Sequence, residues 1–188
     1  MQAIPKPEPV VLTYEDYLAF PNDGKRYEIL WGEVYVNPAP LTVHQRISRN
    51  LEFLLHRHVT EQDLGEVLYA PVDVIFGRTD VVQPDLLFVA KSRLAIIQKH
   101  GVKGPPDLIV EILSKSTAAL DRGGKKQRYA QCGVAHYWIV DPDGCSIDEH
   151  LLQGGAYALI ATHVGEGMRS RLFPELHIEF SRVFPQGR

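Results

Sequence analysis

The chain has 188 residues, of which 45% are hydrophobic and 23% are charged, a composition typical of a globular protein with a substantial core. No apolar run approaches the ~20 residues needed to cross a bilayer, and the N-terminus lacks the apolar stretch of a secretory signal. The formal net charge of −3 argues against a protein that coats nucleic acid through bulk electrostatics. Cys132 and Cys145 form no CxxC motif, so we expect reduced thiols in a cytoplasmic protein.

The N-terminal third predicts an arm followed by small elements. Prolines in residues 1–11 favour an extended arm, and we expect one domain over residues 12–188. Thr13 has an acidic residue three positions later, which is typical of a helix N-terminus. The elements expected here are a short helix from Tyr14, a turn at 22–24, and a hairpin of strands 26–31 and 33–37 around Gly32.

From Leu41 the apolar residues recur every three or four positions, which predicts an amphipathic helix to about Thr60. The elements expected after it are strands at 66–70, 72–76 and 83–89, a helix at 90–100, a buried strand at 108–114, a helix within 120–132 that Gly133 ends, a buried strand at 135–141, two strands joined by Gly154 and Gly155, and a short segment at 176–180. This order predicts an α/β fold with a central mixed β-sheet flanked by helices.

Two acidic residues on neighbouring strands are the candidate site. Asp85 follows Gln83-Pro84 at the start of one strand, and Glu111 interrupts the apolar strand LIVEILS. Burying a carboxylate is costly unless it is paired or bound to a cation, so Glu111 is the most informative residue. Two carboxylates that share a hard cation, with a lysine nearby, are what phosphodiester hydrolysis requires. With the Ile112 carbonyl, they would hold one Mg²⁺ or Mn²⁺.

Asp107 is excluded as a partner of Glu111 in such a site. Four strand rises separate the two residues by ~13 Å. Ligands of one Mg²⁺ each lie ~2.1 Å from the ion, so Asp107 is better interpreted as a strand-entry residue. The lysine has three candidates, because Leu113 stands two residues after Glu111 on the same face; we favour Lys125 over Lys115 and Lys126.

Four blocks together resemble one family. The runs EILSKST, DRGGKKQRYAQCGVAHYWIVDP, QPDLLFV and RYEILWGEV are similar to the Uma2 family of restriction-endonuclease-like proteins, within the PD-(D/E)xK nuclease superfamily. The resemblance covers roughly residues 12–184. It implies a Mg²⁺-dependent endonuclease, with DNA as the expected substrate and a possible homodimer, since one such domain cuts one strand.

The resemblance also implies roles for individual residues. It matches Asp85 and Glu111 to the acidic pair and Lys125 to a catalytic lysine displaced onto the helix. It further implies a family-typical Glu28 in the hairpin and His44 on the long helix. The sequence departs from the family pattern at two positions. Lys115 stands where the family usually has proline, so more than one lysine is a candidate for the catalytic role, and His136 stands where the family usually has glutamate.

Other interpretations compete with this one. Arg122, Lys125, Lys126 and Arg128 form a basic cluster that could hold phosphates or be only a solvated helix face. The candidate contacts to nucleic acid are His44, Lys115, Arg122 and Lys126. The chain could also be a catalytically inactive nucleic-acid-binding module, or an oligomerisation domain whose acidic pair binds a cation for stability. A glycosidase with paired carboxylates is less favoured, because a basic helix follows the buried strand.

Overall fold

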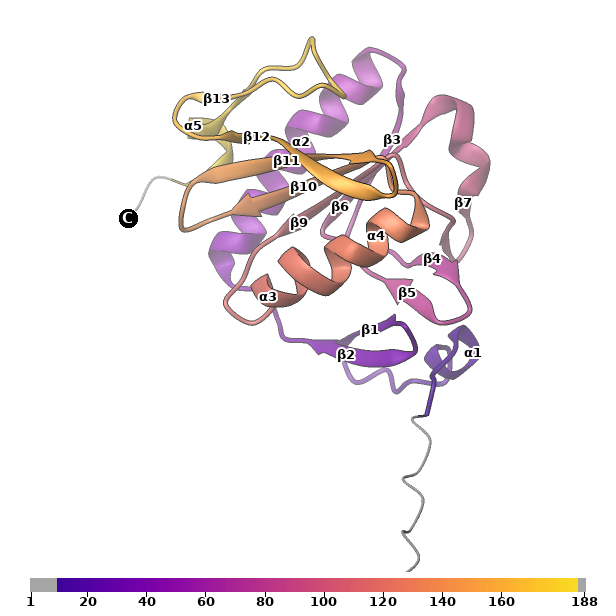
Figure 1. Cartoon of the computed structure of the whole chain (residues 1–188). Coiled ribbons are helices and arrows are strands. Elements are labelled where there is room, and N and C mark those ends of the chain that lie inside the picture. Colours follow the sequence, from indigo (N-terminus) through magenta and orange to yellow (C-terminus); the bar gives the residue numbers. More distant parts are fainter. Residues whose placement is uncertain (1–9, 186–188) are drawn as a thin grey trace, which may run out of the picture.

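The computed structural model describes residues 10–185 and contains two six-stranded sheets with helices packed on them (Figure 1). The predicted arm over residues 1–11 lies almost entirely outside the described residues. The short first helix, α1 (Tyr14–Tyr17), begins as predicted: the Thr13 side chain accepts from the Asp16 N–H, and the Asp16 carboxylate accepts from the Thr13 N–H. No helix among residues 10–185 is long and apolar enough to span a membrane.

The central sheet confirms the predicted mixed α/β fold. Its strand order is β12-β11-β10-β9-β6-β3, and only the β9–β10 pair is parallel. Every residue of β9 is buried, as its apolar sequence requires. The strands are β3 (Gly65–Tyr69), β6 (Leu86–Ala90), β9 (Leu108–Ile112), β10 (His136–Asp141), β11 (Ser146–Gln153) and β12 (Ala156–His163).

Helix α2 (Thr42–Glu61) covers one face of this sheet (Figure 1). Its apolar stripe packs against the even-numbered side chains of β9 and against the C-terminal elements. Those elements are β13 (Gly167–Met168), β14 (Ile178–Glu179) and α5 (Phe180–Val183). The buried apolar residues of α2 are Ile47, Leu51, Leu54, Leu55 and Val59. Because this stripe fixes the rotation of α2, its first turn is held at the end of the sheet where Asp85 lies.

The second sheet was not predicted as a separate unit. It has the order β2-β1-β5-β4-β8-β7 and contains the predicted hairpin. The predicted helix at 90–100 is wrong beyond its first turns. The 3-10 helix η1 (Lys91–Ile96) is followed by two short strands. These strands form because Ile97 pairs with Val102 and both pack into the core between the second sheet and the central sheet. The strands are β1 (Arg26–Leu30), β2 (Glu33–Asn37), β4 (Val74–Gly77), β5 (Asp80–Val82), β7 (Ile97–Gln98) and β8 (Gly101–Lys103).

A helical crossover between β9 and β10 lies on the opposite face of the central sheet from α2 (Figure 1). It consists of α3 (Ala118–Leu120), a π-helical turn η2 (Asp121–Lys125) and α4 (Lys126–Cys132). Gly133 adopts φ 86° and ends α4, as predicted. Tyr129 of the crossover lies in one core cluster with Tyr137 of the central sheet and Leu30 of the second sheet, so the crossover packs against both sheets. Its π turn, a feature often found at functional sites, carries Lys125 into the interior.

Candidate active site

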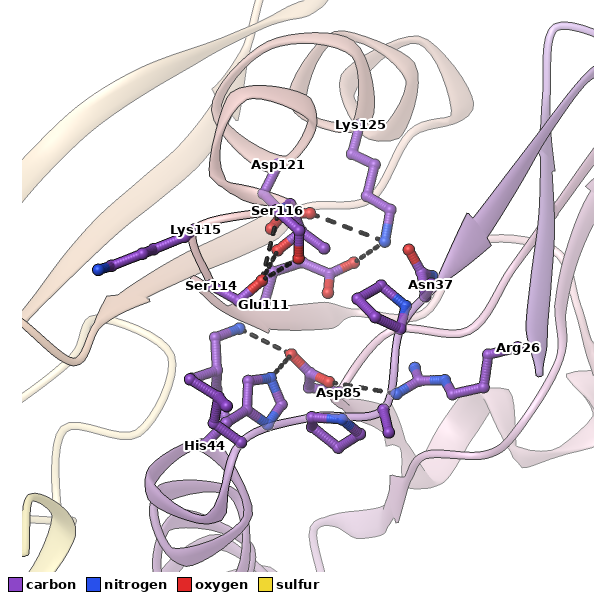
Figure 2. Close-up of a pocket in the computed structure, with 16 residues that line it drawn as sticks. Arg26, Asn37, His44, Asp85, Glu111, Ser114, Lys115, Ser116, Asp121 and Lys125 are labelled. Atoms are coloured by element: carbon purple, nitrogen blue, oxygen red, sulfur yellow. Dashed lines mark hydrogen bonds and ion pairs between the residues drawn. The ribbon is translucent and has the colours of Figure 1, made fainter. Parts of the chain in front are cut away.

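The predicted acidic pair meets at one end of the central sheet. β6 and β9 pair with Leu86 opposite Val110, so the same register continued by one residue places Asp85 opposite Glu111. Both carboxylates line a cavity of about 290 Å³ between the sheet, the start of α2 and the crossover (Figure 2). His44, Lys125 and Asp121 also line this cavity. Segments far apart in the sequence therefore present their charged groups to one space.

Asp85 is 6% exposed and is held in its charged form by its neighbours. Its Oδ2 accepts from the Ile112 N–H at 2.8 Å and lies 3.1 Å from His44 Nε2 (Figure 2). Burial alone would raise the pKa of Asp85. The hydrogen bond and charge of His44, the Ile112 N–H and the Arg26 guanidinium outweigh burial and lower this pKa below its usual value. The nearest cation to Oδ1 is Arg26, at 3.9 Å.

Glu111 has the opposite electrostatic environment. It is 3% exposed, and its Oε1 accepts from Tyr129 Oη at 2.7 Å and from Lys125 Nζ at 3.1 Å. Burial raises the pKa of Glu111 to about 8; Lys125 opposes this shift, and the nearby Asp121 and Asp85 carboxylates add to it. A proton on Glu111 at neutral pH therefore relieves a local excess of negative charge.

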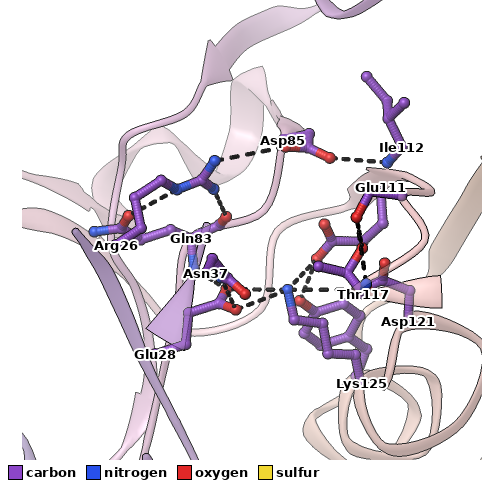
Figure 3. A network of polar contacts seen from close by, with 12 residues as sticks. Arg26, Glu28, Asn37, Gln83, Asp85, Glu111, Ile112, Thr117, Asp121 and Lys125 are labelled. Atoms are coloured by element: carbon purple, nitrogen blue, oxygen red, sulfur yellow. Dashed lines mark hydrogen bonds and ion pairs between the residues drawn. The ribbon is translucent and has the colours of Figure 1, made fainter. Parts of the chain in front are cut away.

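Lys125 is the cation at the centre of this network (Figure 3). Its Nζ lies 2.9 Å from Glu28 Oε2, 3.1 Å from Glu111 Oε1 and 3.7 Å from Asp121 Oδ1. Burial alone would lower the pKa of Lys125, but Glu111, Glu28 and Asp121 raise it above its usual value. The ammonium consequently stays charged across the physiological pH range and can act as a donor, not as a proton acceptor.

Glu28, on β1, fixes Lys125 from the side of the second sheet (Figure 3). It is fully buried; its Oε1 accepts from the Gln83 N–H at 2.7 Å and its Oε2 from Asn37 Nδ2 at 2.7 Å. With the lysine also bound to it, Glu28 has its acceptor sites occupied by protein groups. The contacts of Glu28 therefore hold the Lys125 ammonium in place.

Two residues at the site were missed by sequence reasoning. Asp121 is 1% exposed, and burial raises its pKa to about 6, against the opposing effects of Lys125 and a Thr117 hydrogen bond. Tyr129 is fully buried in the core, and its hydroxyl donates to Glu111. Asp121 stands four residues before Lys125 in a helical segment, and that spacing was the signal that could have found it.

The remaining predicted residues lie at the rim of the site or beyond it. Lys115 is exposed and lines the cavity. Arg122 is exposed and paired with Asp141 and Asp148 at 3.2 and 3.1 Å. Lys126 is not among the lining residues of this cavity. Asp107 accepts from Arg93 at 2.7 Å and from the Ala90 N–H at 2.8 Å, as a strand-entry residue would.

The donor set suits a hard divalent cation. Within residues 10–185, the hydrogen bonds to Asp85 all fall on Oδ2 and those to Glu111 all fall on Oε1, so each carboxylate keeps one oxygen available. The β6–β9 register also places Pro84, which has no N–H, opposite the carbonyl of Ile112. No cluster of three or more acidic, histidine or cysteine side chains suited to a metal occurs in this part of the chain. The set is therefore two carboxylates and one carbonyl.

Comparison with known proteins identifies the fold and the family of the chain. The fold matches a crystal structure described as a putative nuclease belonging to DUF820 from Anabaena variabilis ATCC 29413, with a TM-score of 0.74 and 19% identity over 92% of this chain and 97% of that chain. The family model of Uma2, described as "Putative restriction endonuclease", matches residues 14–181. The chain belongs to the Uma2 family. No curated protein matches it.

Proposed function

We propose that this chain is a metal-dependent endonuclease that hydrolyses phosphodiester bonds of nucleic acid, with DNA as the expected substrate. The observation that carries the proposal is the pair of carboxylates, Asp85 and Glu111, that line one cavity, each with one oxygen that accepts no hydrogen bond within residues 10–185. Membership of a family described as restriction endonucleases supports the reaction class. A membrane substrate has no comparable support.

Asp85, Glu111 and the Ile112 carbonyl would hold one Mg²⁺ or Mn²⁺. When bound, such an ion polarises a phosphate oxygen and lowers the pKa of a bound water. The chain supplies only these few oxygen ligands, which suits Mg²⁺, an ion that keeps several waters of its own. Binding would also require Glu111 to lose the proton that burial favours, so the ion and this proton compete.

Lys125 would orient the attacking water and stabilise the negative charge that develops on the phosphate. Its raised pKa keeps it a cation, which suits electrostatic stabilisation rather than proton abstraction. Glu28, which accepts a hydrogen bond from Asn37, holds it in place from the second sheet. His44, whose Nε2 faces Asp85, would keep the Asp85 carboxylate oriented with its Oδ1 toward the cavity. Hydrolysis of both strands of a duplex would need two such domains, as in a homodimer.

The test is cleavage of single- and double-stranded DNA and RNA in Mg²⁺ or Mn²⁺, with wild type beside Glu111→Gln. Cleavage by wild type alone supports the proposal and locates the reaction at Glu111. Equal cleavage by both proteins would refute the assignment of the site. If neither protein cleaves, Mn²⁺ binding by wild type would favour a non-catalytic module with an intact cation site.

A further inference from the structure

A second cavity, of about 430 Å³, adjoins the candidate active site. The residues that line both cavities are Arg26, Pro40, His44 and Asp85. The far side of the second cavity is formed by the outward face of α2 and by the end of β3 with the residues that follow it. A ligand in this cavity would therefore lie beside Asp85, which also lines the candidate active site.

The second cavity carries an exposed aromatic ring. Tyr69, the last residue of β3, is 61% exposed and lines the cavity beside Pro71. A ring of this size gains by covering its face, and base stacking is one way for a nucleic acid to do so. Tyr69 takes no part in the hydrogen-bond network that holds Glu28, Lys125 and Glu111, so that network does not account for it.

Arg49 supplies a positive charge at the same cavity. It is exposed, and its guanidinium donates to the Asn50 side chain at 3.0 Å; no carboxylate within residues 10–185 lies within salt-bridge distance of it. Arg49 stands five residues after His44 on α2, which is ~7.5 Å along the helix axis.

We infer that the second cavity binds one unpaired nucleotide of the substrate strand next to the scissile phosphate, with its base on Tyr69 and a flanking phosphate on Arg49. The inference rests on the proposed function and names its substrate class as a strand that is single-stranded or unstacked near the cut. The cavity volume falls within the range of pockets that enclose a small ligand. A base inside a duplex keeps its faces stacked and cannot lie on the tyrosine ring.

The test compares Tyr69→Ala, Tyr69→Phe and Arg49→Ala with wild type on a short fluorescent single strand. Arg46→Ala is the matched control, since Arg46 is exposed on α2 but does not line the cavity. We expect Tyr69→Ala to weaken kcat/KM and oligonucleotide affinity by ~10-fold or more, and Tyr69→Phe and Arg46→Ala by less than about 2-fold. Each variant is also measured on strands with an abasic position scanned along the sequence.

The abasic strands separate stacking from a general effect on folding. At one position near the cut, removing the base should lower the affinity of wild type as much as Tyr69→Ala does. The same removal should not lower the affinity of the Tyr69→Ala variant any further. Full sensitivity of Tyr69→Ala to every abasic position, or unchanged affinity of this variant for the intact strand, would overturn the inference while leaving the proposed nuclease intact. Binding without cleavage leaves affinity as the deciding readout. If wild type neither binds nor cuts any nucleic acid, the proposed function and this inference both fail.

Discussion

Strand β9 has a carboxylate at each end, and the two differ in how their charge is balanced. Asp107, just before the strand, has an arginine and a backbone N–H as partners and is partly exposed. Glu111, near the other end, is buried and shares the Lys125 ammonium with Glu28 and Asp121, and burial raises its pKa to about 8. The first arrangement satisfies its own charge; the second is complete only with a proton or an added cation.

The comparison indicates how a structural carboxylate, Asp107, differs from the carboxylate proposed as functional, Glu111. Three buried carboxylates surround one buried ammonium, so the active-site end carries a negative excess that costs stability. Such a cost is usual where a protein maintains a site for a cation or a reaction. The following variants compare the two ends directly.

The largest expected effect is on cleavage. Glu111→Gln and Asp85→Asn should each reduce metal-dependent cleavage below detection, because each removes an anionic oxygen from the proposed cation site. Asp107→Asn, the control in the same strand, should cleave within about 2-fold of wild type, since Asp107 lies ~13 Å from Glu111 along the strand. Steady-state cleavage rates of the three variants measure this difference. A comparable loss of cleavage in Asp107→Asn would contradict the assignment of Asp85 and Glu111 as the cation ligands.

The next effect identifies the working lysine. Lys125→Met should lower kcat by ~100- to 1000-fold, the usual cost of removing one electrostatic stabiliser. Lys115→Met should mainly change KM, since Lys115 is exposed at the rim of the cavity. Circular dichroism must accompany the rates, because loss of Lys125 leaves Glu28 buried without its cation. If Lys115→Met instead causes the drop in kcat, the lysine assignment is wrong.

Substitutions at the two ends of β9 should also change the stability of the protein in opposite directions. Without metal at pH 8, Glu111→Gln should raise Tm by a few degrees, because a neutral amide removes buried negative charge. Asp107→Asn should lower the free energy of unfolding by about 1 kcal/mol, and Tm by a few degrees, because the half-exposed Arg93 loses its partner. Calorimetric melting in a chelating buffer measures both shifts; shifts of the same sign would contradict the comparison.

A smaller effect is the pH dependence of the metal-free protein. Glu111 has an ordinary pKa of 4.5 that folding raises to about 8, and Asp121 one of 3.8 that folding raises to about 6. Between these values the folded state binds more protons than the unfolded state, so the free energy of unfolding should fall as the pH rises from about 4 to 8. Urea unfolding across this range should show a flatter profile for Glu111→Gln than for wild type.

The sequence predicted the parts of this molecule that depend on strong local patterns. The α2 stripe and the buried strand β9 follow from apolar spacing, and Glu111 was recognised because a carboxylate interrupts an apolar run. The second sheet was missed because β5, β7 and β8 have only two or three residues each, too few for a periodic signal.

The rest of the site depends on tertiary packing. Lys125 was matched by family resemblance rather than spacing, since its approach to Glu111 depends on a π turn that no local pattern predicts. Asp121 looks like an ordinary polar residue at a helix start, and it is buried only because the crossover packs against both sheets. Glu28 meets Lys125 across 97 residues of sequence, a contact that is visible only when the two sheets are brought together.

The most direct test of the account is Mn²⁺ binding by isothermal titration calorimetry at pH 7, with wild type, Glu111→Gln, Asp85→Asn and Asp107→Asn compared. The account predicts one ion per chain for wild type and Asp107→Asn. It also predicts the release of protons on binding and no measurable binding for the other two variants. Equal binding by all four proteins, or loss of binding only in Asp107→Asn, would contradict the claim that Asp85 and Glu111 form the cation site.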